Sequence, residues 1–367
     1  MTPLDVRRRR WSEQAGILVL LDDDELSRLV EGSRTLGWGA SSTATLPDGS
    51  SVFVKRLPLT ELEHERTHST RNHFRLPAVY QYGVGSAGFG AWRELAVHVT
   101  TTGWVIDGSC EGFPMLVHHR VMRRRGGGAG RDTGSWAESP EYVKYWNDSK
   151  RIAAFIEARR ATPFELWLVL EFVPRRMFDW LREHQSSVGG VVDQLLTTIR
   201  FLHDHGVFHF DAHYGNVVTD GSMPLLTDFG LANDRAFHLS PTESAFLDRH
   251  RHYDFGETIY SAGNALLGLL APMSREERKA LLRRFRSNGP IDQDRALDLL
   301  VSNVETLASE NLLGLSPAYA DVVARYRPVI QFMNAFFSTM RGNPRKNTFF
   351  DDSRLAGLLA DAGVDVG

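Results

Sequence analysis

The stretch VFHFDAHYGNVV at residues 207–218, followed by LLTDFGLA at residues 225–232, sets two groups of polar residues among apolar ones. The apolar letters are typical of short strands, and an Asp-Gly turn lies between the two stretches. Such a hairpin brings the carboxylates of Asp211 and Asp228 towards the amide of Asn216. Carboxylate and amide oxygens are ligands that Mg²⁺ prefers in proteins. The sequence therefore predicts a metal and phosphate site here.

The order of the elements predicts the fold class. At 367 residues the chain exceeds the size of about 250–300 residues at which single cores stop growing. Strand patterns come first and helical patterns follow, which indicates an α+β protein of two lobes. We expect a flanking segment at 1–35, a smaller strand-rich lobe at 36–173 with an insertion at about 122–163, and a helical lobe at 174–367.

The composition excludes some classes of partner. Lys and Arg number 42 and Asp and Glu number 45, which gives a formal net charge of −3. Binding to nucleic acid or to an anionic membrane through a general excess of positive charge is therefore not expected. The single cysteine, Cys110, cannot form a disulfide within the chain, which fits a reducing compartment. We predict a cytoplasmic protein, and the sequence does not indicate its oligomeric state.

Two segments raise the question of membrane targeting. Arg7 to Arg10 precede the short apolar run GILVLL, but Glu13 interrupts the segment and LDDDE follows the run. This pattern does not fit a signal peptide, so we interpret the arginines as solvated charge. The longest apolar stretch, YSAGNALLGLLAPM from Tyr260, is too short to span a bilayer and predicts a buried helix.

The polar residues of the opening stretch resemble the catalytic loop and the metal-binding segment of the protein-kinase-like superfamily. His209-Phe210-Asp211 is followed by Asn216 and then by Asp228-Phe229-Gly230, in the order and at the spacing of that family. The resemblance implies a bilobal protein-kinase-like fold with ATP and Mg²⁺ as cofactors. It further implies that Asp211 is the base or orients the acceptor hydroxyl, and that Asn216 and Asp228 bind Mg²⁺.

Upstream segments are similar to the nucleotide-binding parts of the same family. Lys55 ends the strand-like string VFVK, which resembles the strand whose lysine neutralises the α- and β-phosphates. Gly37 and Gly39 lie where the family has its glycine-rich loop. The string LVLEFVP resembles the hinge, which implies that the backbone from Glu171 to Val173 holds adenine.

Two features near Lys55 bear on nucleotide binding. The family pairs this lysine with a glutamate, and we favour Glu94 because a strand-like segment follows its helix as expected; Glu65 in a shorter candidate helix is the alternative. Strand alternation puts Phe53 on the same face as Lys55, where the family usually has alanine. A phenyl ring there crowds the base, so a non-catalytic pseudokinase stays an open hypothesis.

Other departures leave the acceptor open. Phe210 replaces an arginine that pairs with a phosphorylated activation loop in many protein kinases, so control by that phosphorylation is not expected. His213 makes the loop similar to aminoglycoside phosphotransferases and ABC1-type kinases, whereas DFGLA has the protein-kinase form. We predict transfer of the γ-phosphoryl of ATP to a hydroxyl, with protein Ser or Thr favoured over a small molecule. Asp254 departs from the family spacing before Ser261.

Overall fold

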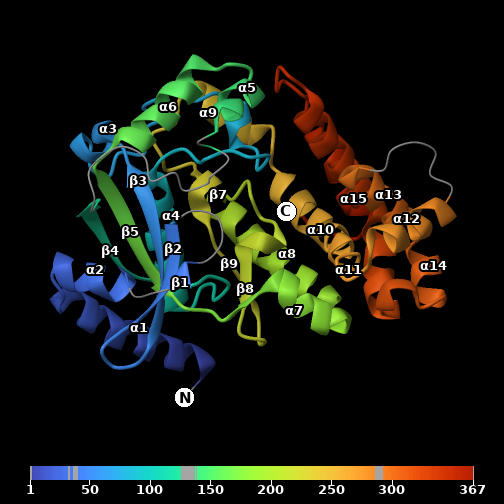
Figure 1. Cartoon of the computed structure of the whole chain (residues 1–367), viewed down its shortest axis with the longest axis horizontal. Helices are drawn as coiled ribbons and strands as arrows, with labels where there is room; N and C mark the ends of the chain where they lie inside the picture. The colour runs from blue at the N-terminus through green and yellow to red at the C-terminus, as the bar shows by residue number, and fades with distance from the viewer. Residues whose placement is uncertain are drawn as a thin grey trace. The chain divides into compact units, whose positions relative to one another are not determined.

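The computed structural model describes residues 2–31, 34–35, 40–124, 137, 139–285 and 292–366. Contacts divide the chain into two compact units. The first unit comprises Met1–Val173 and Thr227–Ser244, and the second comprises Pro174–Leu226 and Ala245–Gly367. A sheet dominates the first unit and helices dominate the second, which confirms the α+β class (Figure 1). The sequence places Thr227–Ser244 with the helical lobe, whereas its contacts group it with the first unit.

The first unit is built on a five-stranded antiparallel sheet in the order β1-β2-β3-β5-β4. In Figure 1, β2, β3, β5 and β4 lie next to one another. Lys55 is opposite Leu168 and Phe53 is opposite Leu170 in the pairing of β3 with β5. The strands are β1 (Arg34–Thr35), β2 (Ala40–Thr45), β3 (Ser51–Leu59), β4 (Leu116–Arg123) and β5 (Phe164–Glu171).

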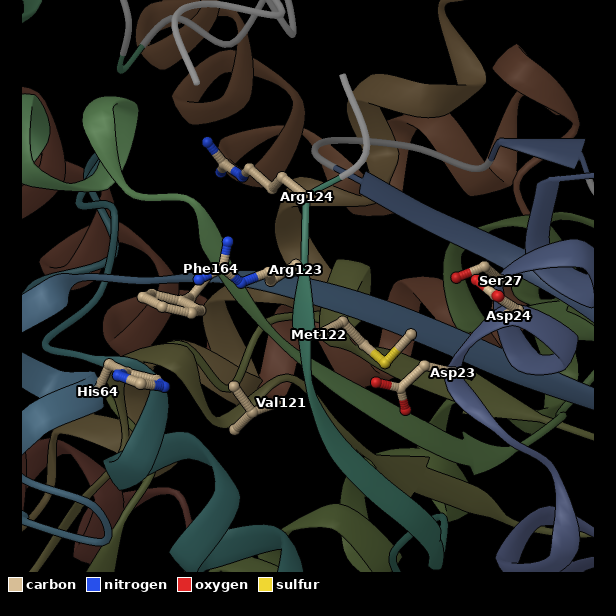
Figure 2. Close-up of a pocket in the computed structure, with 9 residues that line it drawn as sticks. All are labelled: Asp23, Asp24, Ser27, His64, Val121, Met122, Arg123, Arg124 and Phe164. Atoms are coloured by element: carbon tan, nitrogen blue, oxygen red, sulfur yellow. The ribbon is translucent and has the colours of Figure 1, made fainter. Parts of the chain in front are cut away.

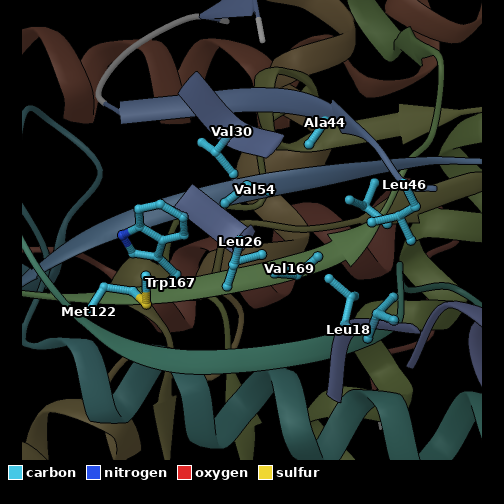
Figure 3. Packing of buried hydrophobic residues seen from close by; sticks show 11 residues of the cluster. Leu18, Leu26, Val30, Ala44, Leu46, Val54, Met122, Trp167 and Val169 are labelled. Carbon is cyan, nitrogen blue, oxygen red and sulfur yellow. The ribbon is translucent and has the colours of Figure 1, made fainter. Parts of the chain in front are cut away.

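Alternation along the strands gives this sheet two apolar faces. Val54, Trp167 and Val169 point to one face, where Leu18 and Leu26 pack against them (Figure 3). These two leucines come from α1 (Pro3–Leu20) and α2 (Asp23–Glu31), so the flanking segment is part of the core of the first unit.

The opposite face of the sheet carries Lys55 and Phe53. Leu166, Leu168 and Leu170 of β5 pack there with residues of α4 (Ala91–Asp107), and the half-buried ring of Phe53 packs against the same cluster. Burial of one leucine side chain contributes about 1.5–3 kcal/mol, so this contact fixes α4 beside the strand of Lys55. The short helix α3 (Glu61–Glu65) lies between β3 and α4 in the chain.

The predicted insertion at about 122–163 contains two described helices, α5 (Pro140–Tyr145) and α6 (Lys150–Ala161). Asn147 and Asp148 separate them with positive φ angles of 58° and 51°. Residues 125–136 and 138 of this insertion lie outside the described residues.

The second unit is mainly helical. α10 (Tyr253–Asn264) contacts α8 (Val188–Asp204) and α15 (Pro317–Gly342), and α10 with α11 (Leu266–Leu269) occupies the stretch that predicts a buried helix. Across the described ranges, no helix is long and apolar enough to cross a membrane. The other helices are α7 (Met177–Glu183), α12 (Arg275–Arg284), α13 (Gln293–Ser302), α14 (Val304–Ser309) and α16 (Asp352–Asp361).

Short strands frame the stretch that opens the sequence. In the second unit, β6 (Arg175–Arg176), β8 (Val217–Thr219) and β9 (Pro224–Leu226) form an antiparallel sheet, and β7 (Val207–Phe208) precedes the polar loop. The tight turn between β8 and β9 uses Gly221, which has a φ of 100° that favours glycine. β10 (Asn233–Asp234) follows in the first unit, and α9 (Pro241–Asp248) begins there and continues into the second unit.

Candidate active site

Lys55 lies at the centre of an ionic cluster in the first unit. Its Nζ is 2.6 Å from Glu94 Oε1 and 2.7 Å from Asp228 Oδ1. Lys55 comes from β3, Glu94 from the first turn of α4, and Asp228 from the segment after β9. The Glu94 side chain is buried, whereas that of Asp228 is 43% exposed. One cation therefore joins three segments that are distant in sequence.

The electrostatics of this cluster follow from burial and from charge. Burial acts to lower the pKa of Lys55, but the carboxylates of Asp228 and Glu94 raise it, and the resulting pKa lies above the ordinary value. Burial raises the pKa of Glu94, and the negative charge of Asp228 raises it further. Together these two effects outweigh Lys55, which lowers the pKa of Glu94. Lys55 is therefore a permanent cation at neutral pH.

The backbone around Asp228 is held in an uncommon conformation. Asp228 has φ 65° and ψ 75°, in the left-handed region, and its Oδ1 accepts a hydrogen bond from Gly230 N at 3.4 Å. Phe229 is fully buried, with its ring 4.8 Å from that of His98 on α4. A Cβ at Gly230 would lie 3.3 Å from both Asp228 Oδ1 and Glu94 Oε2, so the absence of a side chain there leaves room for the two carboxylates.

Asp211 and Asn216 form a separate pair in the second unit. Asn216 Nδ2 donates to the backbone oxygen of Asp211 at 2.9 Å and to its Oδ2 at 2.7 Å. His213 Nε2 lies 3.5 Å from Asp211 Oδ1, and Asp211 N donates to His209 Nδ1 at 3.2 Å. Because the amide nitrogen of Asn216 is used towards Asp211, its amide oxygen is the atom oriented for a cation.

One face of α10 holds the backbone of this loop. Four side chains at positions i, i+3, i+4 and i+7 share that face and form hydrogen bonds with backbone groups between His209 and Tyr214. Asp254 takes part although its spacing departs from the family pattern. The Asp254 carboxylate accepts hydrogen bonds from His209 N and Phe210 N. Glu257 accepts a hydrogen bond from Ala212 N, and Thr258 donates one to Ala212 O. Ser261 accepts a hydrogen bond from Tyr214 N.

Comparison with known proteins bears on these two groups of residues. A family model described as the protein kinase domain matches residues 137–248. The probable serine/threonine-protein kinase YbdM of Bacillus subtilis is 29% identical over 129 residues, which is 35% of this chain and 43% of the relative. A probable serine/threonine-protein kinase of Dictyostelium discoideum is 25% identical over 75 residues, 19% of this chain and 15% of the relative.

The chain is therefore similar to the protein-kinase-like superfamily. The matched segments span less than half the length of these two curated relatives. Within the chain, the protein kinase domain match includes Asp211, Asn216 and Asp228, but it begins at residue 137, after Lys55 and Glu94. Two members of the ionic cluster, Lys55 and Glu94, therefore lie outside the family match, and the third, Asp228, lies within it.

Glu94, and not the alternative Glu65, contacts Lys55. The helix α3, which carries Glu65, instead holds the start of α4 through a different residue. Glu65 is exposed at the end of α3. The buried Glu63 of α3 accepts a hydrogen bond from Ala91 N at 2.9 Å, at the start of α4. Gly90 has a φ of 132°, and a Cβ there would lie 2.6 Å from Glu63 Oε1. Glu63 therefore positions the first turn of α4, which the sequence did not reveal.

Arg93, next to Glu94, ties α4 to the segment that follows Asp228. Arg93 Nη2 is 2.7 Å from Glu243 Oε1, and both side chains are buried. The same guanidinium donates to Thr70 O at 2.7 Å and to Asn233 Oδ1 at 3.3 Å. No local pattern points to this pair, because its members lie far apart in sequence.

Two buried carboxyls behind Asp211 have pKa values shifted in opposite directions. Burial acts to raise the pKa of Asp254, but hydrogen bonding and attraction from His203 lower it, and the resulting pKa lies below the ordinary value. Burial raises the pKa of Glu257 far above its usual range, and Asp211 and Asp254 act in the same direction. Burial therefore favours the protonated form of Glu257, which limits the negative charge beside Asp211.

The remaining predicted residues concern the nucleotide base and phosphates. Glu171 ends β5 with a side chain that is largely buried, and the half-buried Val173 follows it. Gly37 and Gly39 lie outside the described residues. Arg7, which we interpret from sequence as solvated, instead forms an ion pair with Glu171 at 2.8 Å, because α1 packs on the first unit and does not extend into solvent.

A separate open groove of about 590 Å³ lies elsewhere in the first unit. Figure 2 shows Asp24 and Ser27 at one end of it and His64 and Phe164 at the other. Acidic and basic side chains both line it, so its charge favours no one class of ligand. None of the predicted site residues that the structure describes is among the lining residues, which are Asp23, Asp24, Ser27, His64, Val121, Met122, Arg123, Arg124 and Phe164.

Proposed function

We propose that this protein is an ATP-dependent kinase that transfers the γ-phosphoryl of ATP to a hydroxyl acceptor, with protein Ser or Thr favoured. The observation that carries the proposal is the cluster in which Lys55 contacts both Glu94 and Asp228. A fixed cation beside an accessible carboxylate suits the binding of a metal-bound polyphosphate. The serine/threonine kinase names of the two relatives support the choice of acceptor.

The first unit supplies the donor side of the proposed reaction. Lys55 neutralises charge on the α- and β-phosphates, and Glu94 holds its ammonium group. The backbone of Glu171 to Val173 binds adenine. Gly37 and Gly39, which lie outside the described residues, are assigned to phosphate binding by the family resemblance alone.

The donor atoms fit Mg²⁺. Asp228 offers an accessible carboxylate and Asn216 an amide oxygen, which are hard oxygen ligands. Among the residues that the structure describes, no group of three or more His, Cys, Asp or Glu could hold a metal ion. Mg²⁺ usually takes most of its shell from phosphate oxygens and water, so one protein carboxylate such as that of Asp228 is enough to hold it. When bound, Mg²⁺ supplies positive charge to the phosphate oxygens.

The second unit supplies the acceptor side. The Asp211 carboxylate is oriented by Asn216 and orients the attacking hydroxyl or takes its proton. Since α10 fixes the peptide groups on both sides of Asp211, this carboxylate is preorganised and its position does not depend on a flexible loop.

A small-molecule phosphotransferase is the second candidate. The observation that favours it is His213, whose Nε2 lies 3.5 Å from Asp211 Oδ1 at a position where serine/threonine kinases usually have lysine. A cytoplasmic location is proposed for either enzyme, on the basis of the single cysteine.

The test is Mg²⁺-dependent ADP production from ATP by the purified protein and four variants. We expect Asp211→Ala and Asp228→Asn to reduce turnover by about 100-fold or more, because each removes a group that acts on the transferring phosphoryl or on its acceptor. Glu94→Gln should reduce it by about tenfold. Glu65→Gln is the matched control and should leave turnover unchanged, because Glu65 is exposed and has no contact with Lys55.

Melting temperatures of all variants control for folding. A wild-type protein that neither turns over ATP nor gains thermal stability with Mg·ATP would refute the kinase proposal and support the non-catalytic alternative. Once turnover is established, Ser- and Thr-containing peptides are compared with aminoglycosides as acceptors. Incorporation of labelled phosphate identifies which class accepts it.

A further inference from the structure

We propose that Arg7 of α1 is a positioning residue for the nucleotide-binding end of β5, an inference that rests on the proposed function. Its guanidinium makes a two-point contact with Glu171, with Nε 3.0 Å from Oε1 and Nη2 2.8 Å from Oε2. Two-point contacts between arginine and a carboxylate fix orientation as well as distance. The Arg7 and Glu171 side chains are only 14% and 10% exposed, so water screens the pair weakly.

Arg7 also bonds to the chain before β4. Nη1 donates to Glu111 O at 3.0 Å and Nη2 donates to Phe113 O at 2.7 Å. The carboxylate of Glu171 in turn accepts from Met115 N at 3.2 Å, and Glu171 N donates to Met115 O at 2.8 Å. Arg7 thus joins α1, the segment before β4 and the last residue of β5 through one buried set of bonds.

The rest of α1 is anchored independently of Arg7. Arg7, Trp11, Gln14 and Leu18 recur at the spacing of one helical face. Trp11 Nε1 donates to Leu116 O at 2.8 Å, Gln14 Nε2 donates to Ser51 O at 3.2 Å, and Leu18 is fully buried in the core of Figure 3. Removal of the Arg7 guanidinium should therefore leave α1 docked and act on Glu171.

The consequence for the nucleotide follows from the place of Glu171. Its backbone and that of Val173 are the groups proposed to hold adenine, and Glu171 is where the chain leaves the sheet. Without Arg7, a largely buried carboxylate loses its cation and must move towards solvent or take a proton. Either change disturbs the adjoining backbone before adenine binds, so that part of the binding free energy is used to restore it.

The test compares Arg7→Ala, Arg7→Lys and the control Arg10→Ala, which removes the same charge from an exposed position on the same helix. Calorimetric titration with Mg·ADP gives the dissociation constant, and steady-state assays give the KM for ATP and kcat. We expect Arg7→Ala to raise the dissociation constant and the KM by about tenfold with kcat within about twofold. Arg7→Lys should be intermediate because it restores charge without the planar fork, and Arg10→Ala should match the wild type.

Glu171→Gln provides a second route if Arg7→Ala does not fold. It keeps the shape of the side chain but weakens the pair, so it should raise the dissociation constant, and addition of Arg7→Lys should raise it little further. Wild-type affinity for Mg·ADP in Arg7→Lys and Glu171→Gln would overturn the inference, as would a lower melting temperature of Arg7→Ala with unchanged affinity. A wild-type protein that binds no nucleotide would instead refute the proposed function itself.

Discussion

Replacement of Arg93 by methionine should destabilise the first unit strongly. Arg93 and Glu243 are 2% and 5% exposed, and 2.7 Å separates their charged atoms. Methionine fills most of the volume of the arginine stem but leaves the Glu243 carboxylate buried without its cation. The carbonyl of Thr70 also loses the Nε donor that lies 2.7 Å from it.

The magnitude follows from the burial of the pair. Loss of one partner of a buried ion pair typically costs about 3–5 kcal/mol, because the remaining charge keeps its desolvation penalty. We take the lower part of this range, since Glu243 retains bonds from Ser240 N at 2.9 Å and Ser240 Oγ at 2.8 Å. At about 3 °C per kcal/mol, the melting temperature should fall by roughly 10 °C.

The dependence on pH gives a second signature. Burial acts to raise the pKa of Glu243, but Arg93 and hydrogen bonds from Ser240 lower it, and the resulting pKa lies below the ordinary value of a glutamate. A carboxyl with a lowered pKa in the folded state contributes stability above its unfolded pKa, and this contribution is lost as the pH falls through the folded pKa. The stability difference between wild type and Arg93→Met should therefore be largest near pH 7 and shrink below about pH 4.5.

Thermal and urea unfolding measure both effects. Arg71→Met is the matched control, because Arg71 is an exposed arginine of the same unit whose removal should cost less than about 0.5 kcal/mol. The double variant Arg93→Met/Glu243→Leu should recover much of the loss, since it leaves no unpaired charge. We take the error of comparing two melting temperatures as about 2 °C. If Arg93→Met melts within that error of Arg71→Met, the reasoning is refuted.

Two further predictions concern Glu257 and Phe53. The pKa of Glu257 is raised in the folded state, so the contribution of this carboxyl to stability falls as the pH rises above its pKa in the unfolded chain. The variant Glu257→Gln still accepts the hydrogen bond from Ala212 N. In thermal unfolding it should be as stable as the wild type at pH 5 and more stable than the wild type at pH 8. Greater loss of stability at pH 8 than at pH 5 would show that the carboxyl is charged. Phe53→Ala should lower the unfolding free energy by about 1–2 kcal/mol, because the ring is half-buried, yet tighten Mg·ADP binding by calorimetry. Weaker binding would show that the ring supports the base.

Much of the candidate site was predictable because its chemistry is concentrated in short segments. Asp211 and Asn216 lie five residues apart, and the spacing alone allows them to meet, as the bonds from Asn216 Nδ2 show. The alternation of β3 likewise put Phe53 and Lys55 on one face, where the structure has them. The α+β class was predictable for the same reason, since periodicity is a local property.

Partners distant in sequence were not predictable in this way. Arg7 was interpreted as solvated because a run of arginines has no local partner, and only the docking of α1 places it on Glu171. Asp254 departs from the family spacing, yet the direction of α10 puts its carboxylate on two loop amides. Arg93 and Glu243 meet through the packing of α4.

The sequence by itself determined which residues we propose to carry chemistry, namely Lys55, Asp211, Asn216 and Asp228, because residue type and short spacing are written in the chain. The tertiary structure decided which charges neutralise one another. It selected Glu94 over Glu65 for Lys55, since Glu94 faces the sheet from the first turn of α4 while Glu65 is exposed. Charge pairing requires atoms within a few ångströms in a desolvated setting, and only the packing of helices on the sheet creates that proximity and that burial.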